Sequence, residues 1–584
     1  MLTLPLLALA VAVTLVAGYR FVGRAVAARL GLDDARTTPA HACRDGVDFE
    51  PTPPSYLLGQ HFSAIAAAGP IVGPILACQQ FGWLPCVLWI ALGCVLIGAV
   101  HDLTALVASV RHGAKTVAEV VRQHLSPRAW AAFLAFIWLA LLYVIVAFTD
   151  VTAGSFLGRI EELEGVKVGF ERGGAVALAS IAYLTLAVVM GLVQRLLRPP
   201  LWLVTAVFVP LAFGTVWLGS AGSTWLALSG PSAKLVWGVS ILGYCFVASL
   251  LPVWTLMQPR GYLGGFMLYV VLIVGVIGVL FGGFATQQPG FAGFVQRTPE
   301  GAATPTGWLF PFLFVTIACG ACSGFHGLVC SGTTSKQIDR ESHCGTVGYG
   351  GMLLEGFVAL VALSTVMIVA PAAAAGKPPG AIYGAGIGEY LCVILGSREH
   401  LLLATVFGTM AFSTFVFDTL DVATRLGRHI VQELLGKPGA AWGAAATAAT
   451  VGVPLLFVLT ADPDAKRPAY MAYWTLFGAS NQLLAALTLL AVSVWLKRTG
   501  RPAWFTFLPC LFVMAATATA LAKIAVDGLS GGAGFAALAN AGVALVLLGL
   551  TALLVVEAVL AIRRPRVAEV DEACADPAPP APAV

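Results

Sequence analysis

Long apolar runs follow one another along almost the whole chain, each close to the 20 or so residues that a bilayer-spanning helix requires. About fifteen such runs can be read between polar breaks. Their approximate bounds are 2–23, 59–80, 84–110, 129–157, 174–196, 199–219, 234–256, 262–284, 308–331, 345–371, 400–430, 441–460, 468–496, 504–525 and 535–562. Since a helix satisfies its own backbone hydrogen bonds in lipid, the series predicts an all-α polytopic membrane protein with about 15 transmembrane helices.

The composition excludes several other classes of protein. Hydrophobic residues make up 59% of the 584 residues and charged residues only 11%, whereas a soluble domain carries roughly 25% charged residues. Too few charges remain to cover a soluble surface, to keep a chain disordered or to bind nucleic acid. Most of the 12 cysteines lie inside apolar runs, where they act as small hydrophobes. Cys319 and Cys322 form a C-x-x-C without a second pair, so no metal site is predicted.

The distribution of basic residues predicts the orientation in the membrane. With fifteen spans, 23 of the 33 Lys and Arg fall on the side that also carries the C-terminus. Loops rich in Lys and Arg stay in the cytoplasm, so we expect a periplasmic N-terminus and a cytoplasmic C-terminus. The loops are short, and 111–128 is expected to form an amphipathic cytoplasmic helix.

Two of the runs contain helix-breaking residues near the middle of the membrane. In 59–80, Gly69-Pro70 and Gly73-Pro74 predict that the backbone unwinds before Pro70, where a new half-helix starts; a simple packing kink is the alternative. In 308–331 and just beyond, glycines, hydroxyl residues and His326 cluster in an otherwise apolar segment. We expect Ala66–Pro74 and Ser323–Thr334 to be non-helical and to face one cavity.

The two broken runs cross the membrane in opposite directions in the predicted topology, which is the pattern of an inverted-repeat transporter with two discontinuous helices. A five-plus-five repeat is therefore expected, with two further helices between the repeats and a disordered tail. The expected parts are an N-terminal helix and cytoplasmic loop over 1–58, a first repeat over 59–219, two intervening helices over 220–307, a second repeat over 308–496, two C-terminal helices over 497–562 and the tail 563–584. The Gly-rich stretch Ala381–Gly396 is expected to be re-entrant or interfacial.

Ionisable residues inside spans are costly, about 2.5–3.5 kcal/mol each on insertion scales, and so indicate function. Glu355 lies about ten residues into its run and is predicted to couple transport to a proton; a structural carboxyl is the alternative. Asp418, Asp421 and Arg425 are predicted to form a gate or a structural ion pair, with Asp421 and Arg425 paired at helical spacing. Asp102 lies near a span end and is expected to be interfacial.

A substrate site is predicted around the two breaks, because half-helix N-termini offer free amides and partial positive charge to a carboxylate. Asn481 and Gln482 are expected to support it by hydrogen bonding to neighbouring helices. Ser413 and Thr414 are candidate ligands for a cation. Histidines at the breaks are alternatively buried core residues. The predicted substrate-binding residues are His61, Gly69, Gly73, Ser323, His326, Ser331, Thr333, Thr334 and Ser335.

These residues carry a pattern that resembles the carbon starvation protein A family, which includes bacterial peptide and pyruvate transporters. The motifs are Thr38-Pro39-Ala40-His41, Asp45-Gly46-Val47-Asp48-Phe49-Glu50-Pro51-Thr52, Gly59-Gln60-His61-Phe62 with both Gly-Pro pairs, Ala318-Cys319-Gly320, Ser323-Gly324-Phe325-His326, Ser331-Gly332-Thr333-Thr334-Ser335-Lys336, Gly350-Gly351-Met352-Leu353-Leu354-Glu355, Trp474, Phe477-Gly478 and Ser480-Asn481-Gln482. The family is similar to the amino acid–polyamine–organocation superfamily. The resemblance implies uptake of pyruvate or short peptides across the bacterial inner membrane by proton symport with alternating access.

Several alternatives stay open at this point. A membrane sensor that uses the transporter fold to detect the same ligand is the main rival, and a sodium-coupled symporter is another. Pyruvate needs only donors for one carboxylate, whereas a peptide also needs an acidic group for its amine, for which Glu355 or Asp418 is available. No catalytic motif is present, so no enzyme is predicted. The expected partners are the lipid bilayer and a small carboxylate or peptide substrate, with a proton or sodium as the coupling ion and no cofactor.

Overall fold

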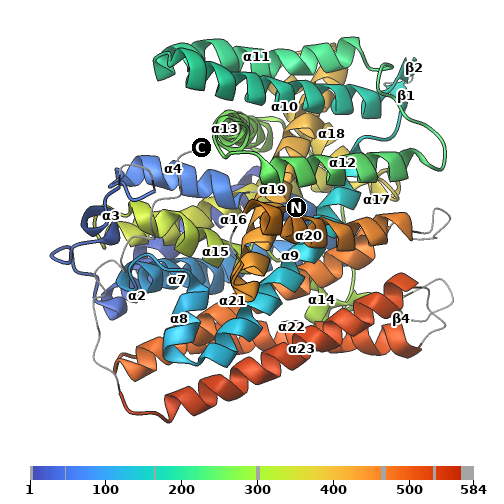
Figure 1. Cartoon of the computed structure of the whole chain (residues 1–584). Helices are drawn as coiled ribbons and strands as arrows, with labels where there is room; N and C mark the ends of the chain where they lie inside the picture. Colours follow the sequence, from blue (N-terminus) through green and yellow to red (C-terminus); the bar gives the residue numbers. More distant parts are fainter. Residues whose placement is uncertain are drawn as a thin grey trace.

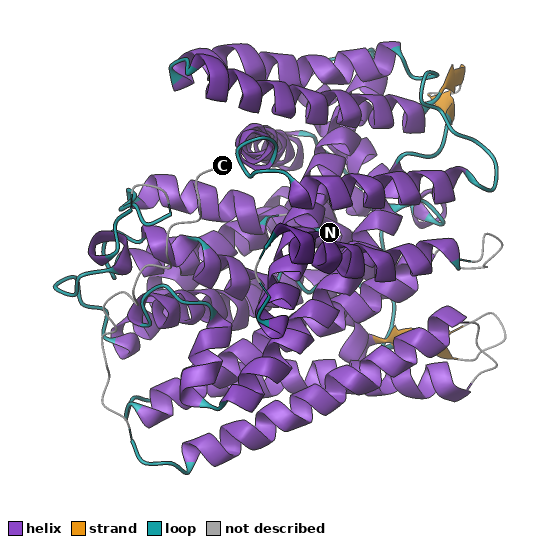
Figure 2. Ribbon diagram, in the orientation of Figure 1, coloured by secondary structure: helices purple, strands orange, loops and turns teal. Residues whose placement is uncertain are grey.

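A computed structural model of the chain describes residues 4–45, 48–66, 68–163, 166–297, 303–437, 439–461, 469–530 and 535–566. These residues are nearly all helical (Figure 2). Two short antiparallel hairpins complete them, β1 (Ile160–Leu163) with β2 (Val166–Phe170) and β3 (Val295–Arg297) with β4 (Ala303–Trp308). Both hairpins lie at the right of Figure 1, whereas α2 and α3 lie at the opposite side.

The helices of the first half begin and end as follows: α1 (Leu4–Ala17), the π-helix η1 (Gly18–Gly23), α2 (Arg24–Leu30), α3 (Pro39–Ala42), α4 (Pro54–Ile65), α5 (Gly69–Phe81), α6 (Trp83–Gly93), the π-helix η2 (Cys94–Gly98), α7 (Ala99–Arg111), α8 (Val117–His124), α9 (Pro127–Ser155), α10 (Arg172–Leu197), α11 (Leu201–Ala221), α12 (Ala233–Leu250) and α13 (Met257–Phe281). Those of the second half are α14 (Leu309–Thr316), α15 (Gly324–Gly332), the 3-10 helix η3 (Thr334–Gln337), the π-helix η4 (Gly345–Tyr349), α16 (Gly350–Met367), α17 (Pro371–Ala374), α18 (Pro379–Leu395), α19 (Leu401–Leu435), α20 (Ala440–Leu459), α21 (Ala469–Arg498), α22 (Trp504–Ser530) and α23 (Phe535–Ile562).

The predicted fold class is confirmed. Within the described residues, 13 helices are long and apolar enough to cross a membrane, and α4 with α5 adds a fourteenth, bent by 51°. The remaining one of the fifteen expected runs, 308–331, is divided into α14 and α15, which are both too short to span on their own. The count of about fifteen is therefore approximate because one span is broken.

The first break lies where the sequence predicts it. Helix α4 ends at Ile65 and α5 begins at Gly69, with Pro70 in its first turn. Proline suits this position because its missing N–H would have no partner in the first turn of a helix. The non-helical segment is shorter than the expected Ala66–Pro74, since Pro74 lies inside α5.

The second break lies further upstream than the sequence predicts. Helix α14 ends at Thr316 and α15 begins at Gly324, so most of the expected break Ser323–Thr334 is helical. The carbonyl groups released at the end of α14 accept hydrogen bonds from other helices. Trp474 Nε1 donates to the Thr316 oxygen over 3.0 Å, and Trp89 Nε1 donates to the Ile317 oxygen over 3.0 Å. These partners let the chain leave the helix at depth without stranding its polar groups.

Helix packing is duplicated. Helix α9 packs against α19 and both pack against α12 and α20, while α13 contacts α4, α16 and α19 just as α21 contacts α15, α7 and α9. This correspondence pairs α4–α5 with α14–α15, α7 with α16, α12 with α20 and α13 with α21. Helices α10 and α11 form a hairpin at the edge of the molecule (Figure 1). The contacts thus favour α12 and α13 over α10 and α11 as members of the first repeat, whose expected bounds 59–219 stay a prediction.

The connecting segments add few elements. The expected amphipathic loop helix is α8, whose Val117, Val120 and Val121 are buried. The stretch expected to be re-entrant or interfacial is the 17-residue helix α18, which packs against α19 and α13. Among its described residues, the loop between α2 and α4 contains the short helix α3. Glu341 holds this loop, because it accepts the backbone N–H of Asp33 over 2.7 Å and forms a buried ion pair with Arg111 Nε, 2.5 Å away.

Candidate functional site

Buried ionisable side chains from three elements meet beside the second break. Asp102 on α7, His326 on α15 and Glu355 on α16 are each at most 1% exposed. His326 Nδ1 lies 2.9 Å from one carboxylate oxygen of Asp102, and His101 Nδ1 lies 2.7 Å from the other. On the opposite side of the ring, His326 Nε2 lies 2.8 Å from Glu355 Oε2. One imidazole is thus held between two carboxylates.

The hydrogen bonding of this cluster is incomplete on the Glu355 side. His326 Nε2 and both carboxylate oxygens of Glu355 make no hydrogen bond with any other described residue, although two of these atoms are within ion-pair distance. Burying unpaired charge is costly, so a buried carboxylate next to an imidazole favours a state in which a proton neutralises the pair. Chemically, the site is suited to holding and releasing a proton.

His61 links the first broken helix to the residues beyond α15. His61 on α4 is buried, and its Nδ1 lies 2.9 Å from the hydroxyl of Thr334. A Cβ on Gly351 of α16 would collide with the His61 ring, so this glycine permits the close approach of α4 to α16. His61 and His326 therefore come from the two broken helices, and both lie against α16.

Asn481 bridges the second break from α21. Its Oδ1 accepts the backbone N–H of Phe325 over 3.0 Å, and its Nδ2 lies 3.1 Å from the hydroxyl of Ser323 and 3.3 Å from the sulfur of Cys319. Gln482 Nε2 lies 3.4 Å from the carbonyl oxygen of Ile317. Asn481 and Gln482 thus hold the segment between α14 and α15 by hydrogen bonds from a neighbouring helix, as expected for them.

Gly69 and Gly73 lie at a close crossing of α5 with the end of α14. A Cβ at Gly73 would collide with the carbonyl oxygen of Thr316, and a Cβ at Gly69 would collide with the sulfur of Cys319. These glycines therefore permit helix contact, and their predicted role in substrate binding stays a prediction.

The hydroxyl motif after α15 is engaged mainly with its own backbone. Ser331, Thr333 and Ser335 each donate to the carbonyl oxygen four residues earlier, over 2.7, 3.2 and 3.2 Å. Thr334 differs, because its hydroxyl contacts His61. Of the four, Thr334 is thus the one whose hydroxyl contacts a side chain of the first broken helix.

The expected ion pair between Asp421 and Arg425 is not formed. Asp421 and Asp418 on α19 instead pair with Arg260 of α13, which is 1% exposed. Tyr244 donates to Asp421 over 2.7 Å and completes this network. Arg425 points to the end of α12, where it donates to the carbonyl oxygens of Ala248 and Leu251. Asp421 and Arg425 have a helical spacing that suits an ion pair, but the packing of α13 against α19 places Arg260 beside the carboxylates instead.

Sequence reasoning missed two members of these sites. Asp102 was expected at an interface, yet it is fully buried and joins His326 to His101. Its adjacency to His101 inside an apolar run was the available signal. The sequence analysis gives Arg260 no role, and no local pattern indicates its two acidic partners, Asp418 and Asp421.

Comparison with known proteins gives a consistent result. The model of the family described as carbon starvation protein CstA matches residues 3–384 and 372–520. The peptide transporter CstA of Campylobacter jejuni is 33% identical over 564 residues, which cover 86% of this chain and 77% of that protein. The pyruvate/proton symporter BtsT of Escherichia coli is 31% identical over 602 residues, covering 88% and 80%. A crystal structure of an Eremococcus coleocola manganese transporter matches with 12% identity and a TM-score of 0.44, covering 89% and 99%.

Proposed function

This chain belongs to the carbon starvation protein CstA family and is a secondary transporter of many membrane spans, and we propose that it takes up a small carboxylate by proton symport. The observation that carries the proposal is the buried arrangement of Asp102, His326 and Glu355. This arrangement supports the proposal, because a buried pair of imidazole and carboxyl groups is suited to binding a proton and the adjacent helix break is suited to binding a carboxylate.

The proposed proton site lies between His326 and Glu355. His326 donates from Nδ1 to Asp102, so its Nε2 faces the carboxylate of Glu355. With no proton between them, a lone pair would face a negative charge in a medium of low dielectric constant. One proton removes this repulsion. Movement of the half-helix α15 away from α16 would separate the two groups and release the proton, which is how alternating access would be coupled.

Pyruvate is the first candidate substrate. A peptide site needs a free acidic group for the amine, and the available candidates are occupied: Asp418 pairs with Arg260, and Glu355 faces His326. A monocarboxylate needs only donors, and the start of α15 offers its backbone amides other than that of Phe325, which Asn481 already accepts. The name of the pyruvate/proton symporter relative supports this choice.

Short peptides are the second candidate. They are favoured by the printed names of relatives such as the peptide transporter CstA of Campylobacter jejuni. Such a substrate would require Arg260 to release Asp418, which is the more exposed of its two partners, with 24% of its side chain accessible.

Uptake into proteoliposomes tests the proposal. Vesicles with an alkaline interior are expected to concentrate labelled pyruvate, and a sodium gradient without a pH gradient is expected to leave it unconcentrated. Accumulation driven only by sodium would contradict proton coupling. Accumulation of labelled dialanine without accumulation of pyruvate would replace the first candidate by the second.

A further inference from the structure

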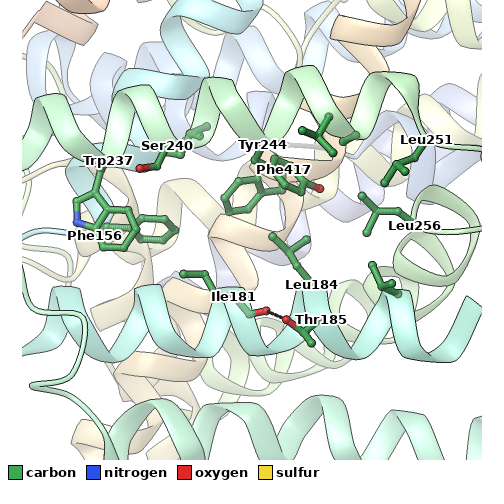
Figure 3. Close-up of a pocket in the computed structure, with 14 residues that line it drawn as sticks. Phe156, Ile181, Leu184, Thr185, Trp237, Ser240, Tyr244, Leu251, Leu256 and Phe417 are labelled. Atoms are coloured by element: carbon green, nitrogen blue, oxygen red, sulfur yellow. Dashed lines mark hydrogen bonds between the residues drawn. The ribbon is translucent and has the colours of Figure 1, made fainter.

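An elongated groove separates α10 from α12 at the edge of the molecule, away from the buried cluster (Figure 3). Its volume is about 400 Å³, and Phe417 and Phe156 form part of its floor. Along α12 its lining extends from Trp237 to Leu251. Fourteen residues at 1.5 Å per residue correspond to a length of about 21 Å.

The groove presents almost only hydrocarbon. Its hydroxyl groups are already bonded: Thr185 donates to the carbonyl of Ile181 over 2.8 Å, Ser240 donates to that of Val236 over 2.8 Å, and Tyr244 donates to Asp421 over 2.7 Å. Among the lining side chains, Trp237 Nε1 is the donor without a partner in the described residues, so a polar occupant would lose most of its hydrogen bonds to water without replacing them. The chemistry of the groove favours an alkyl chain.

Three arginines contact residues in or next to one end of the groove. Leu251 and Leu256 line this end, and Arg425 donates to the carbonyl of Leu251. Arg428 donates to the neighbouring carbonyl of Ser249 over 2.6 Å. The guanidinium carbon of Arg195 lies 5.5 Å from the centroid of the Trp254 ring.

None of these three arginines forms an ion pair with a carboxylate of the described chain. In addition, the Nε atoms of Arg425 and Arg428 have no hydrogen-bond partner there. Three positive charges at the mouth of a hydrocarbon groove complement a ligand with one anionic end and one alkyl end.

We propose that this groove binds one acyl chain of an anionic phospholipid, with the headgroup phosphate at Arg195, Arg425 and Arg428. The arginines lie at the membrane side predicted to be cytoplasmic, where anionic lipids attract basic residues. One leaflet contributes about half of the roughly 30 Å hydrocarbon core, and this length fits within the groove. The inference does not depend on the substrate or on the coupling ion.

The bound chain would connect the α10–α11 hairpin to the rest of the molecule. Tyr244 lines the groove with its ring and bonds to Asp421 with its hydroxyl, so the groove adjoins the Arg260 network directly. A lipid there would fill the space between the hairpin and the duplicated set of helices.

Native mass spectrometry of the purified full chain tests the proposal with dioleoyl phosphatidylglycerol and dioleoyl phosphatidylcholine as probes. We expect phosphatidylglycerol to bind with at least fivefold higher affinity. Ser240→Trp and Val247→Trp fill the groove from exposed positions and are expected to abolish binding of both lipids. Val239→Trp is the matched control, because this neighbouring residue is also exposed but does not line the groove.

The headgroup contacts are tested separately. Arg195→Gln and Arg428→Gln are each expected to reduce the preference for phosphatidylglycerol about fivefold, with Lys437→Gln as the control cation. Inorganic phosphate at millimolar concentration is expected to leave the lipid bound. Equal binding to the Ser240→Trp, Val247→Trp and Val239→Trp proteins would overturn the groove assignment. Displacement of the lipid by phosphate would overturn it in favour of a site for a free anion.

Discussion

Glu355 is the buried side chain that we propose to couple transport to a proton, and this role depends on its neighbours. It is fully buried on α16, and the group closest to its charge is the ring of His326, at 2.8 Å. Asp102 holds the other side of that ring, so the ring cannot turn away without breaking a bond. We therefore expect the three residues to respond to a proton as a unit.

We expect Glu355→Gln to retain exchange of substrate and to lose accumulation driven by a pH gradient. Glutamine keeps the size of the side chain but cannot bind and release a proton. Counterflow and pH-driven uptake in the same proteoliposomes measure the two properties separately. Glu557→Gln on α23, outside the cluster, serves as the control. If the Glu355 variant still concentrates substrate in response to pH, the coupling group lies elsewhere.

Arg260 is expected to contribute to stability rather than to coupling. Arg260→Gln leaves Asp418 and Asp421 together without a cation, and removing one partner of a buried pair costs about 3–5 kcal/mol. A lower Tm in detergent is the expected result. Arg425→Gln is the matched control and should lower the Tm less, because Arg425 binds only carbonyl groups among its described contacts. An equal loss in both variants would contradict this assignment.

Among the elements, the two broken helices are held in different ways. The break between α4 and α5 occurs at Gly69-Pro70, which is a local signal. The break between α14 and α15 depends on donors from distant helices, namely Trp89, Trp474 and Asn481. The crossing of α5 with the end of α14 brings the two breaks together.

Gly73→Ala is expected to destabilise the protein by about 1–3 kcal/mol and to reduce transport, because the new Cβ meets the backbone carbonyl of Thr316. Gly332→Ala is a control with open space around its Cβ position and a place in the predicted hydroxyl motif. Thermal unfolding and uptake are measured for both proteins. Transport at the original rate by Gly73→Ala would show that the helices tolerate a wider crossing.

The hydroxyl motif yields a graded prediction. Alanine at Ser331, Thr333, Thr334 and Ser335 together is expected to raise the apparent KM for substrate several-fold for each donor lost, because each lost hydrogen bond weakens the binding of the carboxylate. Thr334→Ala alone is expected to have the largest single effect, because this hydroxyl contacts His61. Transport kinetics of the single and quadruple variants decide this. Normal kinetics of the quadruple variant would leave the motif as a packing element only.

At the scale of the molecule, two similarly packed sets of five helices surround the buried cluster, and the α10–α11 hairpin lies outside them (Figure 1). Helices α9 and α19 form the fifth corresponding pair, one in each set, and they pack against each other. Such duplication allows one set to move relative to the other around a common site, as alternating access requires.

The orientation of the molecule is tested with reporters at its ends. A green fluorescent protein fused after Val584 is expected to fluoresce in bacteria, whereas alkaline phosphatase fused there is expected to be inactive, because the excess of basic residues keeps this side in the cytoplasm. A fusion within the loop between α9 and α10 is the control and is expected to behave in the opposite way. Active phosphatase after Val584 would invert the predicted topology.

The sequence by itself determined the number and position of the spans to within one, because bilayer thickness dictates the length of an apolar helix. It also determined the first break, since the constraint of Pro70 is local to the backbone, and the buried carboxyl Glu355. Only the tertiary structure decided the position of the second break, the place of Asp102 beside His326, and the choice of Arg260 over Arg425 as the partner of Asp421. These contacts join helices that are far apart in the chain, and which side chains meet there depends on how the helices pack.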